Sequence, residues 1–130
     1  MKNPKINMII TKEEKGYSVS AKLGEDFIGT QGEDFEELKT NILKAVNLAV
    51  EDKGLVYSID EIRFTLDIQS FFEFYKVINA KALSQRIGMN QSLLAQYITG
   101  KKKPSPTQTE RILKGVQQIG RELSEIRFLM

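Results

Sequence analysis

The sequence of 130 residues contains no cysteine, no histidine and no tryptophan, and only three prolines. Without cysteine there are no disulfides, no thiolate metal ligands and no thiol nucleophile. Without histidine, the usual general base and the commonest metal ligand of proteins are missing as well. We therefore predict that the protein is not an enzyme, and that it has no catalytic residues, no metal site and no cofactor.

Long hydrophobic runs are also missing. The longest uninterrupted apolar runs, such as Met8-Ile9-Ile10, are far too short to span a bilayer. The N-terminus lacks the apolar segment that a secretory signal peptide needs. Hydrophobic residues make up 41% of the chain and charged residues 28%, which is the balance of a globular protein. We expect a cytoplasmic protein with one ordinary domain or two small ones.

The net charge of +2 conceals two halves of opposite sign. Residues 1–69 contain nine Lys/Arg against thirteen Asp/Glu, a net charge of −4. Residues 70–130 contain ten Lys/Arg against four Asp/Glu, a net charge of +6. This asymmetry predicts two domains with these bounds and with different partners, the basic one facing a polyanion.

Hydrophobic residues in the first half follow strand spacing, then helix spacing, then strand spacing again. A helix is predicted from Phe35 to Val50, with Asp34 capping its N-terminus and Gly54 ending it. Strands are predicted at residues 5–11, 17–21, 27–30 and 62–68. The order βββαβ predicts an α+β domain in which one helix packs across one face of a small sheet.

The second half reads as helices and turns throughout. Helices are predicted at residues 71–78, 80–87, 90–99 and 105–127. Gly88 and Gly100 end the second and third of these helices, and Ser105 caps the fourth. Gly115 and Gly120 are positions at which the last helix could be interrupted.

The second and third of these helices satisfy the requirements of a helix-turn-helix, in which two short helices pack steeply through a tight turn. Ser84 is a small residue at the point where the helices touch, and Gly88 tolerates the positive φ that the turn requires. Apolar residues with suitable spacing anchor both helices to a core, namely Leu83, Ile87, Leu94 and Tyr97 or Ile98.

Residues 71–120 resemble the phage-repressor (Cro/C1-type) helix-turn-helix family, and residues 97–106 (YITGKKKPSP) resemble its loop after the recognition helix. The resemblance implies an all-α domain that binds double-stranded operator DNA, with the helix from Asn90 in the major groove. It places base-reading residues at Gln91, Ser92 and Gln96. A glutamine side chain can form two hydrogen bonds with the edge of adenine. It places phosphate contacts at Asn79, Lys81, Asn90, Lys101, Lys102 and Lys103. The plainer interpretation is a solvated lysine loop beside an ordinary polar helix surface.

The first half is similar to HicB-type antitoxins, on the evidence of residues 14–20 (EKGYSVS) and 28–41 (IGTQGEDFEELKTN). The resemblance covers residues 5–68 and implies a partial ribonuclease-H-like fold. It also implies pairing with a HicA-type toxin, a small basic mRNA endoribonuclease that the antitoxin masks. The family commonly carries an added DNA-binding domain, so the two resemblances are compatible.

An acidic domain that meets a basic toxin gains electrostatic steering and can occupy the surface that binds RNA phosphates. The candidate toxin-binding residues form one predicted cluster, namely Asp26, Glu33, Asp34, Glu36 and Glu37. The alternative is that acids at a helix start merely stabilise that helix. A nuclease is not expected, because such chemistry needs several carboxylates converging on two metal ions and the strand at 5–11 has none.

The last helix carries a stripe of apolar residues, Ile112, Val116, Ile119, Leu123 and Ile126, with the spacing of a helix-pairing seam. Ile112 and Val116 suit the core of the helix-turn-helix domain, whereas Leu123, Ile126 and Phe128 lie beyond it and favour a homodimer or higher even oligomer. The sequence therefore predicts an antitoxin that masks its toxin and represses its own operon. The alternative is a stand-alone phage-type repressor whose N-terminal domain dimerises or senses a ligand.

Overall fold

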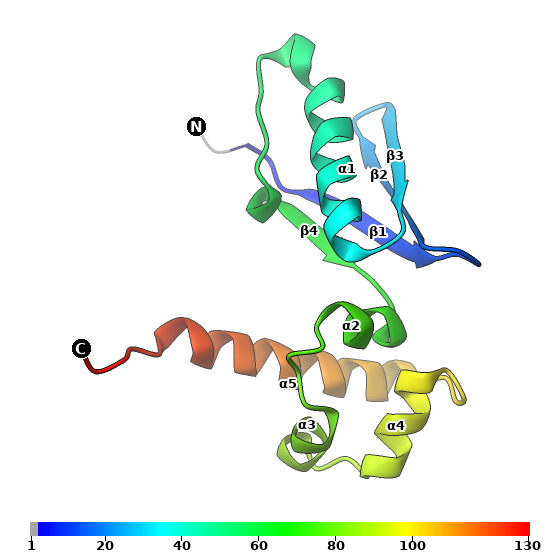
Figure 1. The fold of residues 1–130 in the computed structure, drawn as a ribbon, viewed down its shortest axis with the longest axis vertical. Coiled ribbons are helices and arrows are strands. Elements are labelled where there is room, and N and C mark those ends of the chain that lie inside the picture. Colours follow the sequence, from blue (N-terminus) through cyan, green and yellow to red (C-terminus); the bar gives the residue numbers. More distant parts are fainter. Residues whose placement is uncertain (1–2) are drawn as a thin grey trace. The chain divides into compact units, whose positions relative to one another are not determined.

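The computed structural model describes residues 3–130 and shows an α+β fold, a four-stranded mixed sheet followed by helices (Figure 1). The chain divides into two compact units. Unit 1 runs to Ser70 and unit 2 begins at Phe71, one residue from the predicted boundary. Within the described part of the chain, no helix has both the length and the apolar character needed to cross a membrane.

Unit 1 is built on one sheet with the strand order β3-β2-β1-β4. Its strands are β1 (Ile6–Lys12), β2 (Tyr17–Leu23), β3 (Asp26–Gly32) and β4 (Ile62–Thr65). The first three strands form an antiparallel meander, and β4 returns parallel to β1 after the crossover through α1 (Phe35–Ala49). Strands β3 and β4 are therefore the two edges of the sheet.

One face of this sheet is covered by α1 and the other is not (Figure 1). Leu38, Ile42 and Val46 of α1 are fully buried. On the strands, the alternate residues that face the helix are also buried, including Met8 and Val19, as period-two patterning requires. The predicted cap is confirmed, because the carboxylate of Asp34 accepts a hydrogen bond from the Glu37 N–H at 2.8 Å.

Two predicted boundaries in unit 1 are wrong. Helix α1 ends at Ala49, one residue before the predicted Val50, and Gly54 does not end it but closes the following 3-10 turn η1 (Glu51–Lys53) with a φ of 68°. A second such turn, η2 (Ile59–Glu61), leads into β4. The strand predicted to run to residue 68 stops at Thr65.

A local capping signal explains the second of these errors. The carboxylate of Asp67 accepts a hydrogen bond from the Ser70 N–H at 2.7 Å, so a helix, α2 (Ile68–Phe74), begins where strand alternation appeared to continue. The helix predicted at residues 71–78 is therefore wrong at both ends, because α2 starts three residues earlier and ends four residues earlier. Residues 75–78 form turns, and Val77 is 87% exposed.

The remaining helices of unit 2 are α3 (Ala80–Ile87), α4 (Gln91–Thr99) and α5 (Pro106–Glu125). Gly88 and Gly100 end α3 and α4 in the left-handed conformation, with φ values of 67° and 79°, as predicted. Helix α5 continues without a break through Gly115 and Gly120 and ends two residues before the predicted limit.

The core of unit 2 is small and is formed where α3, α4 and α5 meet. Leu83, Leu94, Tyr97 and Ile112 are buried, as is Ser84, the small residue predicted at the contact of the two short helices. The Ser84 hydroxyl donates a hydrogen bond to the Lys81 carbonyl at 2.7 Å, so burial of this hydroxyl leaves it satisfied.

Candidate nucleic-acid interface

The segment that contains α3, α4 and the loop after them carries positive charge only. Residues 74–109 include six Lys/Arg and no Asp or Glu. The acids of unit 2 lie outside this segment, at Glu73, Glu110, Glu122 and Glu125. Arg86 is paired with Glu122 of α5, so five lysines carry the positive charge of this segment, which attracts a polyanion.

Each helix of this region starts with a neutral cap. Asn79 accepts a hydrogen bond from the Ala82 N–H, and Ser105 accepts one from the Gln108 N–H. Asn90 accepts from the N–H groups of Ser92 and Leu93, at 2.8 and 3.2 Å. The first turns of α3, α4 and α5 contain no acidic residue, whereas α1 carries two there. The positive N-terminal ends of these three helices are therefore not neutralised by acidic side chains, which suits phosphate.

The predicted base-reading residues share one side of α4. Gln91, Ser92 and Gln96 are exposed, while Leu94 and Tyr97 are buried on the opposite side. The cap at Asn90 fixes the start of the helix, and the buried pair fixes its rotation about its own axis. The three polar side chains consequently project away from the core of unit 2.

The lysine loop, residues 101–103, is held close to the end of α4. The Lys102 N–H donates to the Gln96 carbonyl at 3.2 Å, and the Gly100 N–H donates to the Tyr97 carbonyl at 3.3 Å. Lys101, Lys102 and Lys103 are all exposed, as is Lys81 in the first turn of α3. The structure thus leaves all nine predicted DNA-contacting side chains accessible on α3, α4, their caps and the loop that follows α4.

No family model, curated protein or solved structure matches this chain. The assignment of residues to the candidate interface therefore rests on the resemblance of the motifs and on the charges and geometry of the chain itself.

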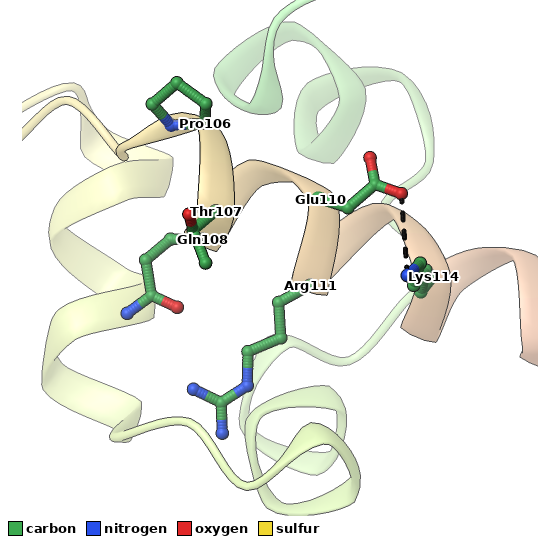
Figure 2. A pocket seen from close by; sticks show the side chains of 6 residues that line it. All are labelled: Pro106, Thr107, Gln108, Glu110, Arg111 and Lys114. Carbon is green, nitrogen blue, oxygen red and sulfur yellow. Dashed lines mark ion pairs between the residues drawn. The ribbon is translucent and has the colours of Figure 1, made fainter.

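Arg111 on α5 is a residue of this region that the sequence interpretation missed. Its guanidinium donates to the Ile87 carbonyl at 3.2 Å and to the Gly88 carbonyl at 2.7 Å, so it holds α5 against the turn between α3 and α4 (Figure 2). Carbonyls at a helix C-terminus that ends in a left-handed glycine attract a cation. The predicted turn at Gly88 was therefore the sequence signal that a nearby cationic side chain would bind there.

A second cross-link joins α3 and α5 through an ion pair. Arg86 donates to a carboxylate oxygen of Glu122 at 2.6 Å. Hydrogen bonding from Arg86, with a further contribution from Gln118, holds the pKa of the Glu122 carboxyl below its usual range. The ion pair also balances the charge of Arg86 within unit 2.

The shallow pocket in Figure 2 gives no sign of a small-molecule site. Its lining residues all lie on α5, namely Pro106, Thr107, Gln108, Glu110, Arg111 and Lys114. It is a hollow along one helix surface that includes the exposed Glu110–Lys114 ion pair. Across residues 3–130, no group of three or more Asp or Glu side chains is placed to hold a metal ion.

The acidic residues proposed for toxin binding do not form one cluster, and that prediction is wrong. Glu33, Asp34, Glu36 and Glu37 lie together at the start of α1. Asp26 is the first residue of β3 and Glu33 follows the last, so six residues lie between them, a distance of about 20 Å at the rise of a strand.

Three of these acids also have local structural partners. Asp34 caps α1, Glu36 pairs with Lys39 at 2.9 Å, and Glu33 pairs with Lys15 at 3.7 Å. The ion pairs are largely exposed and add little stability, so these side chains remain accessible to a partner.

Proposed function

We propose that this chain is a HicB-type antitoxin of a type II toxin–antitoxin system, acting in the cytoplasm. In this proposal, unit 1 is a partial ribonuclease-H-like domain that masks a HicA-type mRNA endoribonuclease. Unit 2 is a helix-turn-helix domain that represses the operon of the chain itself as a homodimer or higher even oligomer.

The observation that carries the DNA-binding half is the acid-free segment 74–109. It combines five lysines, three neutrally capped helix N-termini and the exposed polar side of α4. Phosphate contacts from Lys81 and the lysine loop would orient the domain, while Gln91, Ser92 and Gln96 would read base edges in the major groove.

The toxin-binding half is supported by the acidic character of unit 1 and by its motif residues. Gly16, within the motif EKGYSVS, has a φ of 75°, and a Cβ there would lie 2.6 Å from the Gly32 carbonyl oxygen. The two quoted motifs therefore meet at one end of the sheet, where the acids at the start of α1 are exposed. A basic ribonuclease is the partner that this surface would attract.

The second candidate is a stand-alone phage-type repressor, favoured by the same acid-free segment. In that case unit 1 would dimerise or sense a ligand, and no toxin would be needed. The two candidates differ only in the partner of unit 1.

The deciding experiment combines the chain with the product of the neighbouring gene. We expect a short basic protein that stops growth when expressed alone, forms a stable complex with this chain and becomes harmless when co-expressed with it. We also expect the purified chain to retard DNA from its own upstream region in a gel-shift assay. Binding of the DNA with no binding of any neighbouring gene product would favour the stand-alone repressor, and failure to bind the DNA would contradict both candidates.

A further inference from the structure

Strand β3 is an exposed edge of the sheet in unit 1. It is hydrogen-bonded to β2 on one side, and no other strand of the described chain lies beyond it. Natural edge strands are usually short, or carry lysine, proline or a bulge that prevents pairing with another chain. Strand β3 has seven residues, no lysine and no proline, and no charge from Phe27 to Gly32. The opposite edge, β4, has four residues and includes Arg63.

The register of the β2–β3 hairpin identifies which backbone groups face outward. Gly24, with a φ of 63°, begins a two-residue turn between the paired residues Leu23 and Asp26. Since hydrogen-bonded pairs alternate along an antiparallel ladder, the backbone groups of Phe27, Gly29 and Gln31 point away from β2. The Gln31 carbonyl indeed accepts a hydrogen bond from the Asn41 side chain at 2.7 Å. The open part of the edge is therefore centred on Phe27 and Gly29.

The Phe27 side chain of this stretch is apolar and lies on the sheet face away from α1, opposite to the buried Ile28. Phe27 is 75% exposed, and its ring edge lies 3.6 Å from where a Cβ of Gly29 would be. Ile9, two strands away in the same cross-strand row as Gly29, is 56% exposed. An aromatic ring beside a bare glycine leaves room for a side chain of an added strand.

The charges at the two ends of β3 distinguish between possible occupants. Glu25 and Asp26 lie at one end, and Glu33 and Asp34 at the other. A second copy paired antiparallel about Gly29 would place Asp26 near Glu33 of the other copy, which is repulsive. An extended segment with basic residues at both ends meets attraction at both.

We infer that β3 is the docking edge for an extended segment of a basic protein, which adds a fifth strand to the sheet. Its central apolar side chain would lie against Phe27, and its flanking Lys or Arg would meet the acids at both ends of β3. This inference rests on the proposed function, because the basic protein is the toxin itself. In this arrangement Asp26 and the acids at the start of α1 do not form a cluster, but both bind basic side chains of the same docked segment, one at each end of β3.

The test compares two substitutions at Gly29 in the full-length chain. Gly29→Pro removes the outward N–H and blocks pairing, at a position where an edge strand tolerates proline. Gly29→Ala retains the N–H, and its Cβ meets only ordinary van der Waals contacts. We expect Gly29→Pro to weaken binding of the neighbouring gene product about 10-fold or more, and Gly29→Ala to change it less than about 3-fold.

Hydrogen exchange gives a second measurement that does not depend on any substitution. In the wild-type complex, the amides of Phe27 and Gly29 should become protected relative to the free chain. Gly29→Lys is the alternative variant if Gly29→Pro lowers the melting temperature, because a lysine on the edge would repel a basic strand.

The outcomes separate this inference from the proposed function. If the wild-type chain binds no basic neighbouring product, the antitoxin function itself is contradicted. If it binds that product but Gly29→Pro and Gly29→Lys bind equally well, or Phe27 and Gly29 gain no protection, only the β3 inference fails. A change in self-association of Gly29→Pro, measured by sedimentation, would show that a second copy occupies the edge and would also overturn it.

Discussion

At the scale of single residues, the proposed reading surface depends on two glutamines with no part in the core. Gln91 and Gln96 are exposed, whereas Leu94 and Tyr97 of the same helix are buried. Truncating the glutamines should therefore leave the stability of unit 2 nearly unchanged, because exposed substitutions away from caps and cores cost little. An effect on DNA binding can then be read as an effect on recognition.

We predict that Gln91→Ala combined with Gln96→Ala weakens binding to the operator about 10- to 100-fold, since a bidentate base contact contributes about 1–3 kcal/mol of discrimination. Binding to unrelated DNA should change little. Fluorescence anisotropy with both DNAs at one fixed salt concentration measures this difference. Gln117→Ala, at an exposed position on α5, is the matched control. An equal loss on both DNAs would mean that these glutamines do not read sequence.

The lysine loop should behave in the opposite way. Changing Lys101, Lys102 and Lys103 to glutamate should weaken binding to every DNA sequence and flatten the dependence of affinity on salt, because phosphate contacts release counterions without reading bases. A titration of affinity against salt concentration checks this expectation. Retention of the wild-type salt slope would remove the loop from the interface.

At the scale of elements, α5 determines how α3 and α4 are held. Arg111 bonds the turn between them, Glu122 pairs with Arg86, and Gly115 lies directly over Ile87. A Cβ on Gly115 would lie 2.4 Å from Ile87 Cγ2, whereas nothing lies within 4 Å of a Cβ on Gly120. One helix thus contains two glycines with different physical roles.

We predict opposite effects for alanine at these two positions. Gly120→Ala should raise the free energy of unfolding by about 0.5–1 kcal/mol, because alanine favours a helix interior and meets open space. Gly115→Ala should lower it by about 1–3 kcal/mol, since overpacking against a β-branched side chain outweighs the helix gain. Urea unfolding monitored by circular dichroism measures both. Equal stabilisation by the two substitutions would contradict the close packing of α5 on α3.

At the scale of the whole molecule, the proposed oligomer would use apolar side chains that follow the core of unit 2. Ile112 of the predicted stripe is buried and Val116 and Ile119 are half-buried, so this part belongs to the core of unit 2. Leu123, Ile126 and Phe128 are 61%, 54% and 85% exposed. Ile126, the last residue of the predicted seam, and Phe128 lie beyond the end of α5, so the helical part of the seam ends at Leu123.

We predict that Leu123→Lys combined with Ile126→Lys yields a monomer that remains folded, because neither side chain is buried in its own chain. Light scattering would report the mass. Binding to a two-half-site operator should weaken, because a monomer contacts only one half-site. An unchanged mass would remove Leu123 and Ile126 from the proposed oligomer interface.

The sequence predicted the secondary structure correctly where a single local pattern, such as alternation, a cap or a turn glycine, determines it. Alternation at Tyr17, Val19 and Ala21 defined a half-buried strand, Asp34 identified a helix start, and Gly88 identified a left-handed turn. It failed where two local signals compete. Ile68 continued a strand pattern, but the side chain of Asp67 satisfies the first turn of a helix, and that capping interaction prevails.

What the sequence determined by itself is the α+β class, the helix caps Asp34 and Ser105 and the opposite charges of the two halves, because periodicity, caps and charge act locally or are additive. Only the tertiary structure decided that α5 passes unbroken over Ile87 and that Arg111 binds the α3–α4 turn. It also separated Asp26 from the acids of α1 and left β3 at the sheet edge between them. These features depend on strand order and helix packing, which bring together residues distant in the chain and which local patterns do not encode.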